Sequence, residues 1–310
     1  MTRRVIIDTD PGIDDAIAIL FALAHPELDV AAVTTVAGNI GIETTTRNAL
    51  RILALAGQGI PVHPGAGRPL KRGSRTDTRI HGVDGLGGVA FPEPEEPASS
   101  EPAHMALRRL IADAPAGTID ILALAPLTNI ARFVEEAPDV ARRIGRLIAM
   151  GGAVREPGNV GPRSEFNIAH DPEAAEIVFS AGLPLTLVPL DVTRRVRADA
   201  VYLARLAALG TKQALVCRDL IAAYFTGTSG GESRPLHDPC VPLLALRPDL
   251  FATHSMRLSV NLGEDELAGA LEPGEHALAV AMGTDAPAVL DLLAETLGQA
   301  LSSPRTTSHQ

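Results

Sequence analysis

The sequence has few aromatic residues, few cysteines and no excess of positive charge. Among 310 residues there is no Trp, and two Tyr and seven Phe make up 3% of the chain. Proteins that read single-stranded nucleic acid stack bases on aromatic rings, so this scarcity argues against such a reader. Lys and Arg number 27 against 37 Asp and Glu, a net charge of 27 − 37 = −10. Binding to a nucleic-acid backbone needs clustered cations, so we expect a partner that is small and neutral or cationic.

Two cysteines, Cys217 and Cys240, are too few for a disulfide framework in a chain of this length. We expect them to be free thiols in a reducing compartment. The N-terminal segment MTRRVIIDTD contains only a short apolar stretch before its aspartates, which does not fit a signal peptide. No apolar run reaches the roughly 18 residues of a membrane span. The sequence therefore predicts a cytoplasmic protein.

Short apolar runs alternate with longer amphipathic stretches along the chain. This alternation is typical of βαβ units, and it predicts an α/β fold with a mostly parallel sheet that helices cover on both faces. The expected strands are 5–7, 30–36, 119–124, 146–150, 183–190, 255–262 and 276–282. The expected helices are 16–27, 42–57 with a left-handed cap at Gly57, 129–136, 171–182, 198–209, 211–225, one from Asp238 and one from Ala286.

We expect a single domain over residues 1–301, followed by a flexible tail at 302–310. The segment FPEPEEPASSEPA (91–103) is rich in Pro and Glu, and we interpret it as a solvated connector. Ligands of parallel α/β folds bind where the strand-to-helix loops gather, at the carboxyl ends of the strands.

The segment IIDTDPGIDDAIAI (6–19) places Asp8, Asp10, Asp14 and Asp15 directly after a buried strand, with the helix expected to begin at Asp14 or Asp15. Carboxylates at a helix N-terminus can cap its N–H groups, which explains one or two of them. Four like charges this close cost free energy unless a cation neutralises them. Carboxylate oxygens are hard ligands, so the motif predicts a Ca²⁺ or Mg²⁺ site.

Three further segments end strands with suitable polar groups. Asn39 ends VAGN (36–39), the backbone near Leu124 is exposed before a helix, and Glu165 and Asn167 precede another helix. Each alone would more often be a cap or a turn. Their shared place at strand ends favours a polyhydroxylated ligand such as ribose, because each hydroxyl can both donate and accept.

His237 and Asp238, in LHDPC (236–240), precede an expected helix. Such a pair is usually an N-cap with its neighbour. Alternatively, Asp238 completes a metal shell and His237 protonates a leaving group. The spacing alone leaves both interpretations open.

Together these segments resemble the inosine-uridine-preferring nucleoside hydrolases over nearly the whole chain, from about residue 4 to about 300. The motifs that carry the resemblance, in order, are DTDPGIDDAIAI (8–19), VAGN (36–39), IHGVDGLGG (80–88), APLTNIA (125–131), MGG (150–152), EFNIAHDPEAA (165–175) and HDP (237–239). The resemblance implies a Rossmann-like open sheet flanked by helices, assembled as a homodimer or homotetramer. It also implies hydrolysis of the N-glycosidic bond of ribonucleosides to ribose and free base, in nucleoside catabolism or in purine and pyrimidine salvage.

The resemblance further implies roles for individual residues. The Ca²⁺ ligands would be Asp10, Asp15, Asp238 and the carbonyl of Leu124, and Asp10 would also be the general base that activates water. His237 would be the acid toward the leaving base. The remaining matches are substrate-binding groups: Asp14, Asn39, His81, the Met150 backbone, Asn159, Glu165, Phe166 and Asn167.

The base end of the pocket is less specified. Tyr224, Phe225, Thr228 and Ser229 stand where relatives place base-contacting residues, but Tyr224 and Phe225 fit an ordinary helix core equally well. Two other functions compete. A haloacid-dehalogenase-type phosphatase also ends its first strand with Asp-x-Asp, although Gly12 departs from its usual pattern. A non-catalytic nucleoside or sugar sensor would keep the pocket but would not need both Asp10 and His237.

Overall fold

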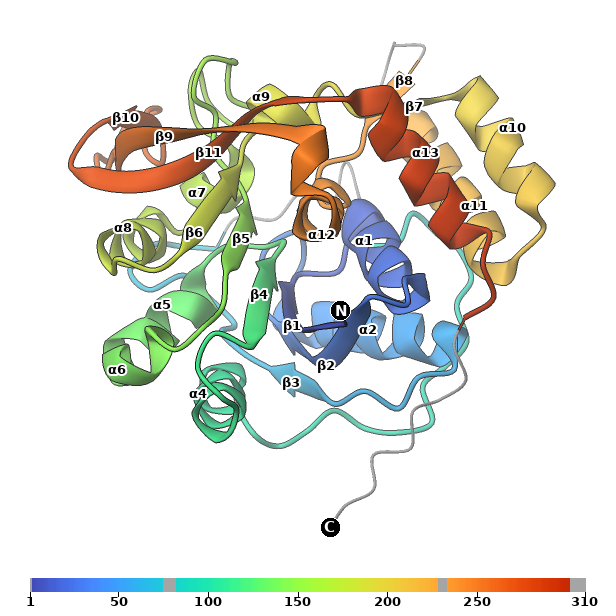
Figure 1. The fold of residues 1–310 in the computed structure, drawn as a ribbon, viewed down its shortest axis with the longest axis horizontal. Helices are drawn as coiled ribbons and strands as arrows, with labels where there is room; N and C mark the ends of the chain where they lie inside the picture. Colours follow the sequence, from blue (N-terminus) through green and yellow to red (C-terminus); the bar gives the residue numbers. More distant parts are fainter. Residues whose placement is uncertain (1, 75–81, 228–232, 302–310) are drawn as a thin grey trace.

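The computed structural model describes residues 2–74, 82–227 and 233–301, and its centre is one large sheet (Figure 1). Within these residues, the strands lie across the sheet in the order β10 (Leu271–Pro273), β9 (Phe251–Val260), β11 (His276–Thr284), β6 (Leu185–Val188), β5 (Leu147–Met150), β4 (Ile119–Ala123), β1 (Arg3–Thr9), β2 (Leu28–Thr35) and β3 (Val62–Pro64). From β11 to β3 every neighbouring pair is parallel. The two antiparallel pairs of this sheet, within the described residues, are β11 with β9 and β9 with β10. The expected mostly parallel α/β sheet is confirmed.

Helices cover both faces of this sheet, as Figure 1 shows. One apolar cluster packs against α1 (Ile13–Ala24), α2 (Ile42–Ala56), α9 (Leu190–Thr193), α10 (Ala200–Leu209), α11 (Lys212–Gly227), α12 (Cys240–Leu246) and α13 (Ala286–Leu297). A second cluster packs against α4 (Ala103–Asp113), α5 (Thr128–Glu136), α6 (Pro138–Ala141), α7 (Phe166–His170) and α8 (Pro172–Ser180).

Strand β1 shows why the central strands are apolar throughout. Successive side chains of a strand point to opposite faces. Val5 and Ile7 belong to the first cluster and Ile6 to the second, and all three are buried. Burial of each such side chain stabilises the fold by roughly 1.5–3 kcal/mol. An uninterrupted apolar run is therefore what a strand buried on both faces requires.

Some elements differ from the sequence-based expectation. The strand expected over 183–190 stops at Val188, because Pro189 cannot donate to the sheet, and α9 follows at once. Helix α4 was not anticipated; it begins at Ala103, the last residue of the connector assigned to 91–103. A small antiparallel sheet of β7 (Arg197–Asp199) and β8 (Ser233–Pro235) was also missed. The left-handed cap at Gly57 is confirmed, with φ of 64°.

The order of the strands creates a crevice beside β1. The chain runs from β1 outward to β2 and β3, then returns through α4 to the other side of β1 as β4. Where the order reverses in this way, the loops after the two adjoining strands leave in opposite directions. The carboxyl ends of β1 and β4 are therefore the expected place for a ligand.

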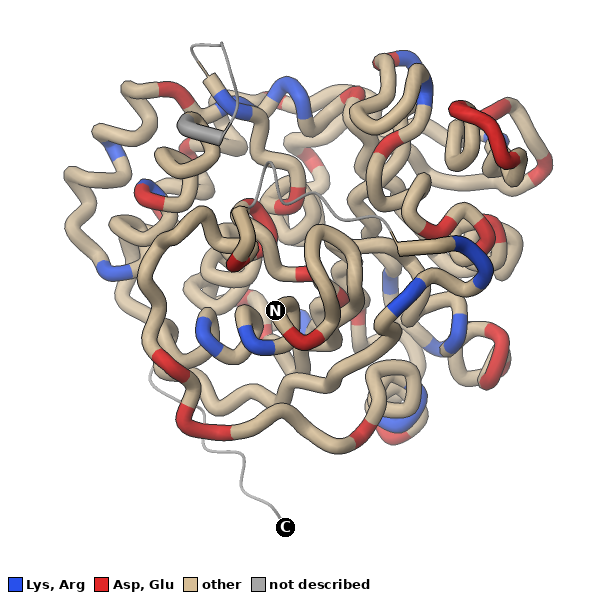
Figure 2. The backbone as a smooth tube through the Cα atoms, turned by 180° about the vertical axis from the view of Figure 1, so that it is seen from behind, with Lys and Arg blue, Asp and Glu red and all other residues tan. Residues whose placement is uncertain are grey.

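The predicted tail at 302–310, His81, Thr228 and Ser229 lie outside the described residues. Among the residues that are described, no helix is both long enough and apolar enough to span a membrane. Figure 2 shows acidic and basic residues interspersed around the fold. By contrast, Asp10, Asp14, Asp15 and Asp238 are buried side chains, and they mark the candidate site.

Candidate active site

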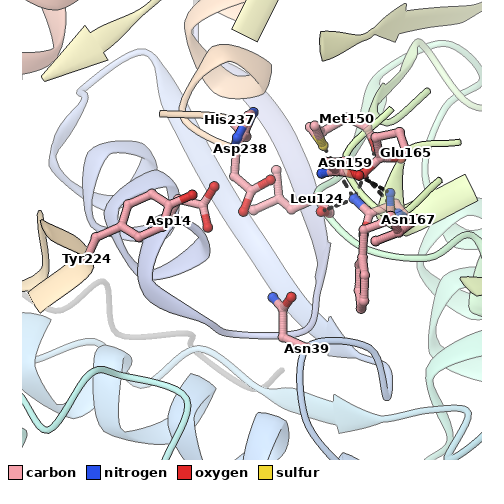
Figure 3. A pocket seen from close by; sticks show the side chains of 12 residues that line it. Asp14, Asn39, Leu124, Met150, Asn159, Glu165, Asn167, Tyr224, His237 and Asp238 are labelled. Carbon is pink, nitrogen blue, oxygen red and sulfur yellow. Dashed lines mark hydrogen bonds between the residues drawn. The ribbon is translucent and has the colours of Figure 1, made fainter. Parts of the chain in front are cut away.

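A pocket opens at the carboxyl ends of the central strands, beside β1 and β4 (Figure 3). Its walls come from α1, α7 and α11, from the loops after β2, β4 and β5, and from the segment before α12. The residues that line it are Asp14, Asn39, Leu124, Met150, Asn159, Val160, Glu165, Phe166, Asn167, Tyr224, His237 and Asp238. Apart from Val160, each of these is a residue that the sequence singled out, so the fold brings together segments that are far apart in the chain.

Asp10 and Asp15 lie beneath this lining, 1% and 0% exposed. The turn after β1 holds Asp15: its Oδ1 accepts a hydrogen bond from Thr9 Oγ1 (2.6 Å) and its Oδ2 accepts one from the Gly12 N–H (3.0 Å). Helix α1 begins at Ile13, one residue before the expected start, so Asp15 occupies the third helical position and caps the helix. Asp15 thus caps the helix and also belongs to the acidic cluster described below.

Asn39 ties the loop after β2 to the same carboxylates. Its backbone N–H donates to Asp10 Oδ2 (2.6 Å), and its side-chain Nδ2 donates to Asp15 Oδ2 (3.2 Å). The preceding residue must be glycine, because a Cβ on Gly38 would stand 2.0 Å from Asp10 Oδ2. Backbone and carboxylate thus approach more closely than any side chain at position 38 allows.

The carboxylates form one acidic cluster. Ligand atoms of Asp14, Asp15 and Asp238 all lie within 4.8 Å of one another. Burial raises the pKa of Asp10 well above its usual value, and the charges of Asp15 and Asp14 add to this. Burial likewise raises the pKa of Asp238, followed by the charges of Asp14, Asp15 and Asp10. Buried oxygens that repel one another this strongly could hold a divalent cation, which would neutralise them.

Of the four predicted metal ligands, Asp15 and Asp238 have ligand atoms within 4.8 Å of each other. Asp10 is close enough for its charge to raise the pKa of Asp238. Asp14, predicted as a substrate-binding residue, belongs to the same cluster. The carbonyl oxygen of Leu124, the fourth predicted ligand, lines the pocket and accepts a hydrogen bond from Asn167 Nδ2 (2.9 Å).

Asp8, the first aspartate of the motif, lies below the pocket. Its Oδ1 accepts hydrogen bonds from Thr34 Oγ1 (2.6 Å) and Asn129 Nδ2 (2.8 Å). Its burial raises its pKa to about 6. Asp8 therefore supports the strands under the site, and it is not among the residues that line the pocket.

The wall after β5 is built around the short helix α7. Glu165 caps it, with Oε1 accepting from the Asn167 N–H (2.9 Å) and Oε2 from the N–H groups of Gly152 (2.9 Å) and Ile168 (3.1 Å). Burial is the main cause that raises the pKa of Glu165, and the charge of Asp14 adds to it. Asn159 Oδ1 accepts a hydrogen bond from the Phe166 N–H (2.9 Å). Figure 3 shows Asn159, Glu165 and Asn167 together at this wall. Helix α7 was not anticipated, because the sequence favoured a single helix from 171.

Asn167 connects this wall to the strands. Its Nδ2 donates to the carbonyl oxygens of Leu124 (2.9 Å) and Met150 (3.2 Å), so it holds the ends of β4 and β5 together. These hydrogen bonds use the amide nitrogen of the Asn167 side chain, so its amide oxygen is the side-chain atom that can accept a hydrogen bond from a ligand.

The opposite wall carries the base-end candidates. His237 and Asp238 lie just before α12, and His237 Nδ1 is 2.7 Å from Thr193 Oγ1 at the end of α9. Tyr224 lines the pocket from α11. Phe225 does not line it; the Arg234 guanidinium lies 4.9 Å from the centre of its ring.

Sequence reasoning missed two residues of the site, Val160 and Thr193. Val160 stands beside Asn159 in an irregular loop, where no periodic pattern marks a side chain as lining. Thr193 ends a one-turn helix that follows the strand expected over 183–190, and no helix was expected there. The 91–103 connector contributes none of the lining residues; its Glu93 pairs with Arg47 and Arg51 of α2.

The profile of the inosine-uridine preferring nucleoside hydrolases matches residues 5–291, almost the whole chain. The chain belongs to this family. Nucleoside hydrolases are N-glycosidases, which cleave the bond between the ribose and the base of a ribonucleoside with water. The phosphatase and the non-catalytic sensor considered above are thereby set aside.

Individual nucleoside hydrolases agree with this assignment. The non-specific ribonucleoside hydrolase RihC of Salmonella paratyphi C is 40% identical over 266 residues, 86% of each chain. The solved structure of the plant nucleoside hydrolase PpNRh1 superposes with a TM-score of 0.91 at 35% identity, over 96% of this chain and 99% of that one. A purine-preferring ribonucleoside hydrolase from Gardnerella vaginalis gives 0.89 at 29% identity, over 96% and 98%.

Proposed function

We propose that this nucleoside hydrolase binds Ca²⁺ in the acidic cluster and hydrolyses ribonucleosides to ribose and free base by direct attack of a water that Asp10 activates. The observation that carries the proposal is a cluster of four buried aspartates, two in the lining of one pocket and two beneath it, beside amide and carbonyl groups. Such a pocket suits a sugar diol at one end and a cation beneath it.

The donor set fits the proposed ion. Asp10, Asp15, Asp238 and the Leu124 carbonyl would hold it, and all four offer the hard oxygen atoms that Ca²⁺ prefers. The raised pKa values of Asp10 and Asp238 support this assignment, because burial and then mutual repulsion disfavour the charged carboxylates, and a bound cation would offset both. When bound, the ion would orient the ribose diol and lower the pKa of a coordinated water.

Asp10 is the proposed general base. The Asn39 N–H holds its Oδ2 at 2.6 Å, so the carboxylate keeps a fixed orientation. It accepts the proton of the attacking water as the new C–O bond forms. Positioned proton transfer of this kind typically accelerates a reaction by about 10²–10⁴-fold.

The polar lining is proposed to bind the ribose. Its members are Asp14, Asn39, the Met150 carbonyl, Asn159, Glu165 and Asn167. Departure of the base leaves an electron-poor sugar, and the negative charge and oxygen atoms of this lining stabilise the positive charge that develops. No covalent intermediate on the protein is needed.

The opposite wall is proposed to bind and protonate the base. His237 gives a proton to the leaving nitrogen, and His81, Phe166 and Tyr224 contact the ring of the base. His237, Tyr224 and Phe166 all line the pocket, Phe166 from α7. The relatives named above include a non-specific and a purine-preferring enzyme, so both purine and pyrimidine nucleosides belong in the test.

We further propose a cytoplasmic homodimer or homotetramer that acts in nucleoside catabolism or in purine and pyrimidine salvage. The location is supported by Cys217 and Cys240, which are both buried free thiols. Light scattering of the purified protein measures the oligomeric state.

The deciding experiment incubates the purified protein with inosine, adenosine, uridine and cytidine. Ribose release is followed as reducing sugar and base release by chromatography. We expect turnover with at least one nucleoside, slow loss of turnover in a strong chelator, and recovery with Ca²⁺. Binding of nucleosides without ribose release would contradict the catalytic proposal, and full turnover by demonstrably metal-free protein would contradict the proposed ion.

A further inference from the structure

The imidazole of His237 makes a hydrogen bond with the buried hydroxyl of Thr193. Thr193 Oγ1 lies 2.7 Å from His237 Nδ1, across 44 residues of sequence. Thr193 is 0% exposed, and its side-chain hydroxyl has no other hydrogen-bond partner among the described residues. The contact therefore forms only when the chain has folded, and it pairs this hydroxyl with His237.

Helix α9, which ends at Thr193, is itself anchored to the pocket wall. The Leu190 N–H donates to the Gly152 carbonyl (2.9 Å), directly after β5. The Asp191 carboxylate accepts hydrogen bonds from the N–H groups of Val154 and Arg155 (2.8 Å each). These contacts fix α9 against the loop that leads to the ribose-side wall, so the Thr193 hydroxyl has a defined place relative to the pocket.

We propose that Thr193 is a positioning residue for His237, an inference that rests on the proposed role of His237 toward the leaving base. A histidine ring can present either nitrogen to a ligand, and the hydrogen bond made by one nitrogen decides which the other presents. With Nδ1 held by Thr193, Nε2 is the nitrogen that faces the base.

A hydroxyl suits this position because it can accept from Nδ1–H or donate to a bare Nδ1. In the proposed step the C1′–N bond breaks, and its electron pair remains on the base nitrogen. That nitrogen takes the proton of Nε2, while Nδ1 keeps its own proton against Thr193 Oγ1. The attacking water gives its hydroxide to C1′ and its proton to Asp10. Return of that proton to His237 through solvent restores the enzyme.

The test compares two substrates that differ in their leaving group. Inosine or uridine needs a proton on the departing base, whereas p-nitrophenyl β-D-ribofuranoside releases a stable anion. In Thr193→Val we expect kcat for the nucleoside to fall about 10–100-fold, with KM within about threefold and hydrolysis of the nitrophenyl riboside near wild type. Thr193→Ser, which keeps the hydroxyl, should recover most of the nucleoside activity.

Two controls separate positioning from general damage. Thr296→Val removes a hydroxyl that is equally buried, in α13, and should leave the ratio of the two activities unchanged. In a His237→Ala background, Thr193→Val should cause no further loss, because residues that act as one unit are not additive. Equal losses on both substrates, or an additive loss in the double variant, would overturn the inference.

The outcomes also distinguish this inference from the proposed function. If His237→Ala loses nucleoside activity selectively but Thr193→Val does not, the positioning role is wrong while the role of His237 stands. If His237→Ala affects both substrates equally, the proposed acid is wrong. If the wild-type protein releases ribose from neither kind of riboside, the proposed function itself fails.

Discussion

The floor of the pocket and the wall that we propose faces the base are built in different ways. On the floor, Asp10 and Asp15 are almost fully buried, and Thr9, Gly12 and Asn39 hold them through several hydrogen bonds. That wall consists of side chains from α11 and from the segment before α12. Tyr224, in α11, retains 9% exposure. Charges that are this tightly fixed suit the proposed chemistry, and a wall of side chains projecting from helices can vary to select the base. We therefore expect floor variants to change rate. On the wall, variants of His237 and its partner Thr193 should also change rate, whereas variants of the other residues should change preference.

The largest effect should come from Asp10→Asn. The substitution keeps the shape of the side chain but removes the negative charge and the proton acceptor. We expect kcat on ribonucleosides to fall by at least about 10³-fold. The measurement is ribose release under saturating substrate, together with circular dichroism to verify the fold.

The matched control for Asp10→Asn is Asp139→Asn, since Asp139 is an exposed residue at 95% side-chain exposure and pairs with Arg142 at the surface. It should retain wild-type turnover. Near-normal hydrolysis by Asp10→Asn would show that another group activates the water.

Gly38→Ala should disturb the floor without removing any functional atom. The added Cβ would stand 2.0 Å from Asp10 Oδ2, so the carboxylate has to move. A displacement of about 1 Å can cost roughly 10²-fold in rate, and we expect a fall in kcat of that order. Gly41→Ala provides the comparison, because a Cβ there meets nothing within 4 Å; a similar loss in both variants would contradict this explanation.

The same contrast explains which parts of the site could be predicted from the sequence. The floor comes from one continuous motif and the end of the next strand, so Asp10, Asp15 and Asn39 lie close together once β1 and β2 pair in parallel. The base-facing wall depends on contacts such as Thr193 with His237, which are separated by 44 residues. No local pattern encodes such a contact, because it arises only when α9 and α12 are packed.

The fold follows the same rule. Strands buried on both faces produce apolar runs that are recognisable in the sequence, and β1, β2, β4 and β5 were predicted for this reason. Helix α7 was missed because it is only one turn long and is capped by Glu165, a residue that the sequence marked for ligand binding. Short capped turns carry too few residues for periodicity to be detected.

Tyr224→Phe tests the wall. The chain has only two tyrosines, so Tyr202→Phe is the natural control: Tyr202 donates to the Leu290 carbonyl in another part of the fold. We expect Tyr224→Phe to change the ratio of kcat/KM between inosine and uridine by about 3–10-fold, because a hydrogen bond contributes a net free energy of roughly 0.5–1.5 kcal/mol. Tyr202→Phe should leave the ratio unchanged. An unchanged ratio in both variants would place Tyr224 with the helix core.

The smallest effect concerns stability, and it again depends on the floor. In the protein without metal, burial raises the pKa of Asp8 to about 6 and raises those of Asp10 and Asp238 well above their usual values. Above pH 4 the unfolded chain has lost these protons while the folded protein still binds them, so stability falls as the pH rises through the folded-state values. We expect the Tm in a chelator to fall by about 5 °C between pH 5 and pH 8, measured by scanning fluorimetry. With Ca²⁺ the slope should be smaller, because a bound cation keeps the Asp10 and Asp238 carboxylates ionised at every pH in this range. A Tm that rises with pH in the chelator would mean that the floor carboxylates are not the groups that limit the stability of the metal-free protein.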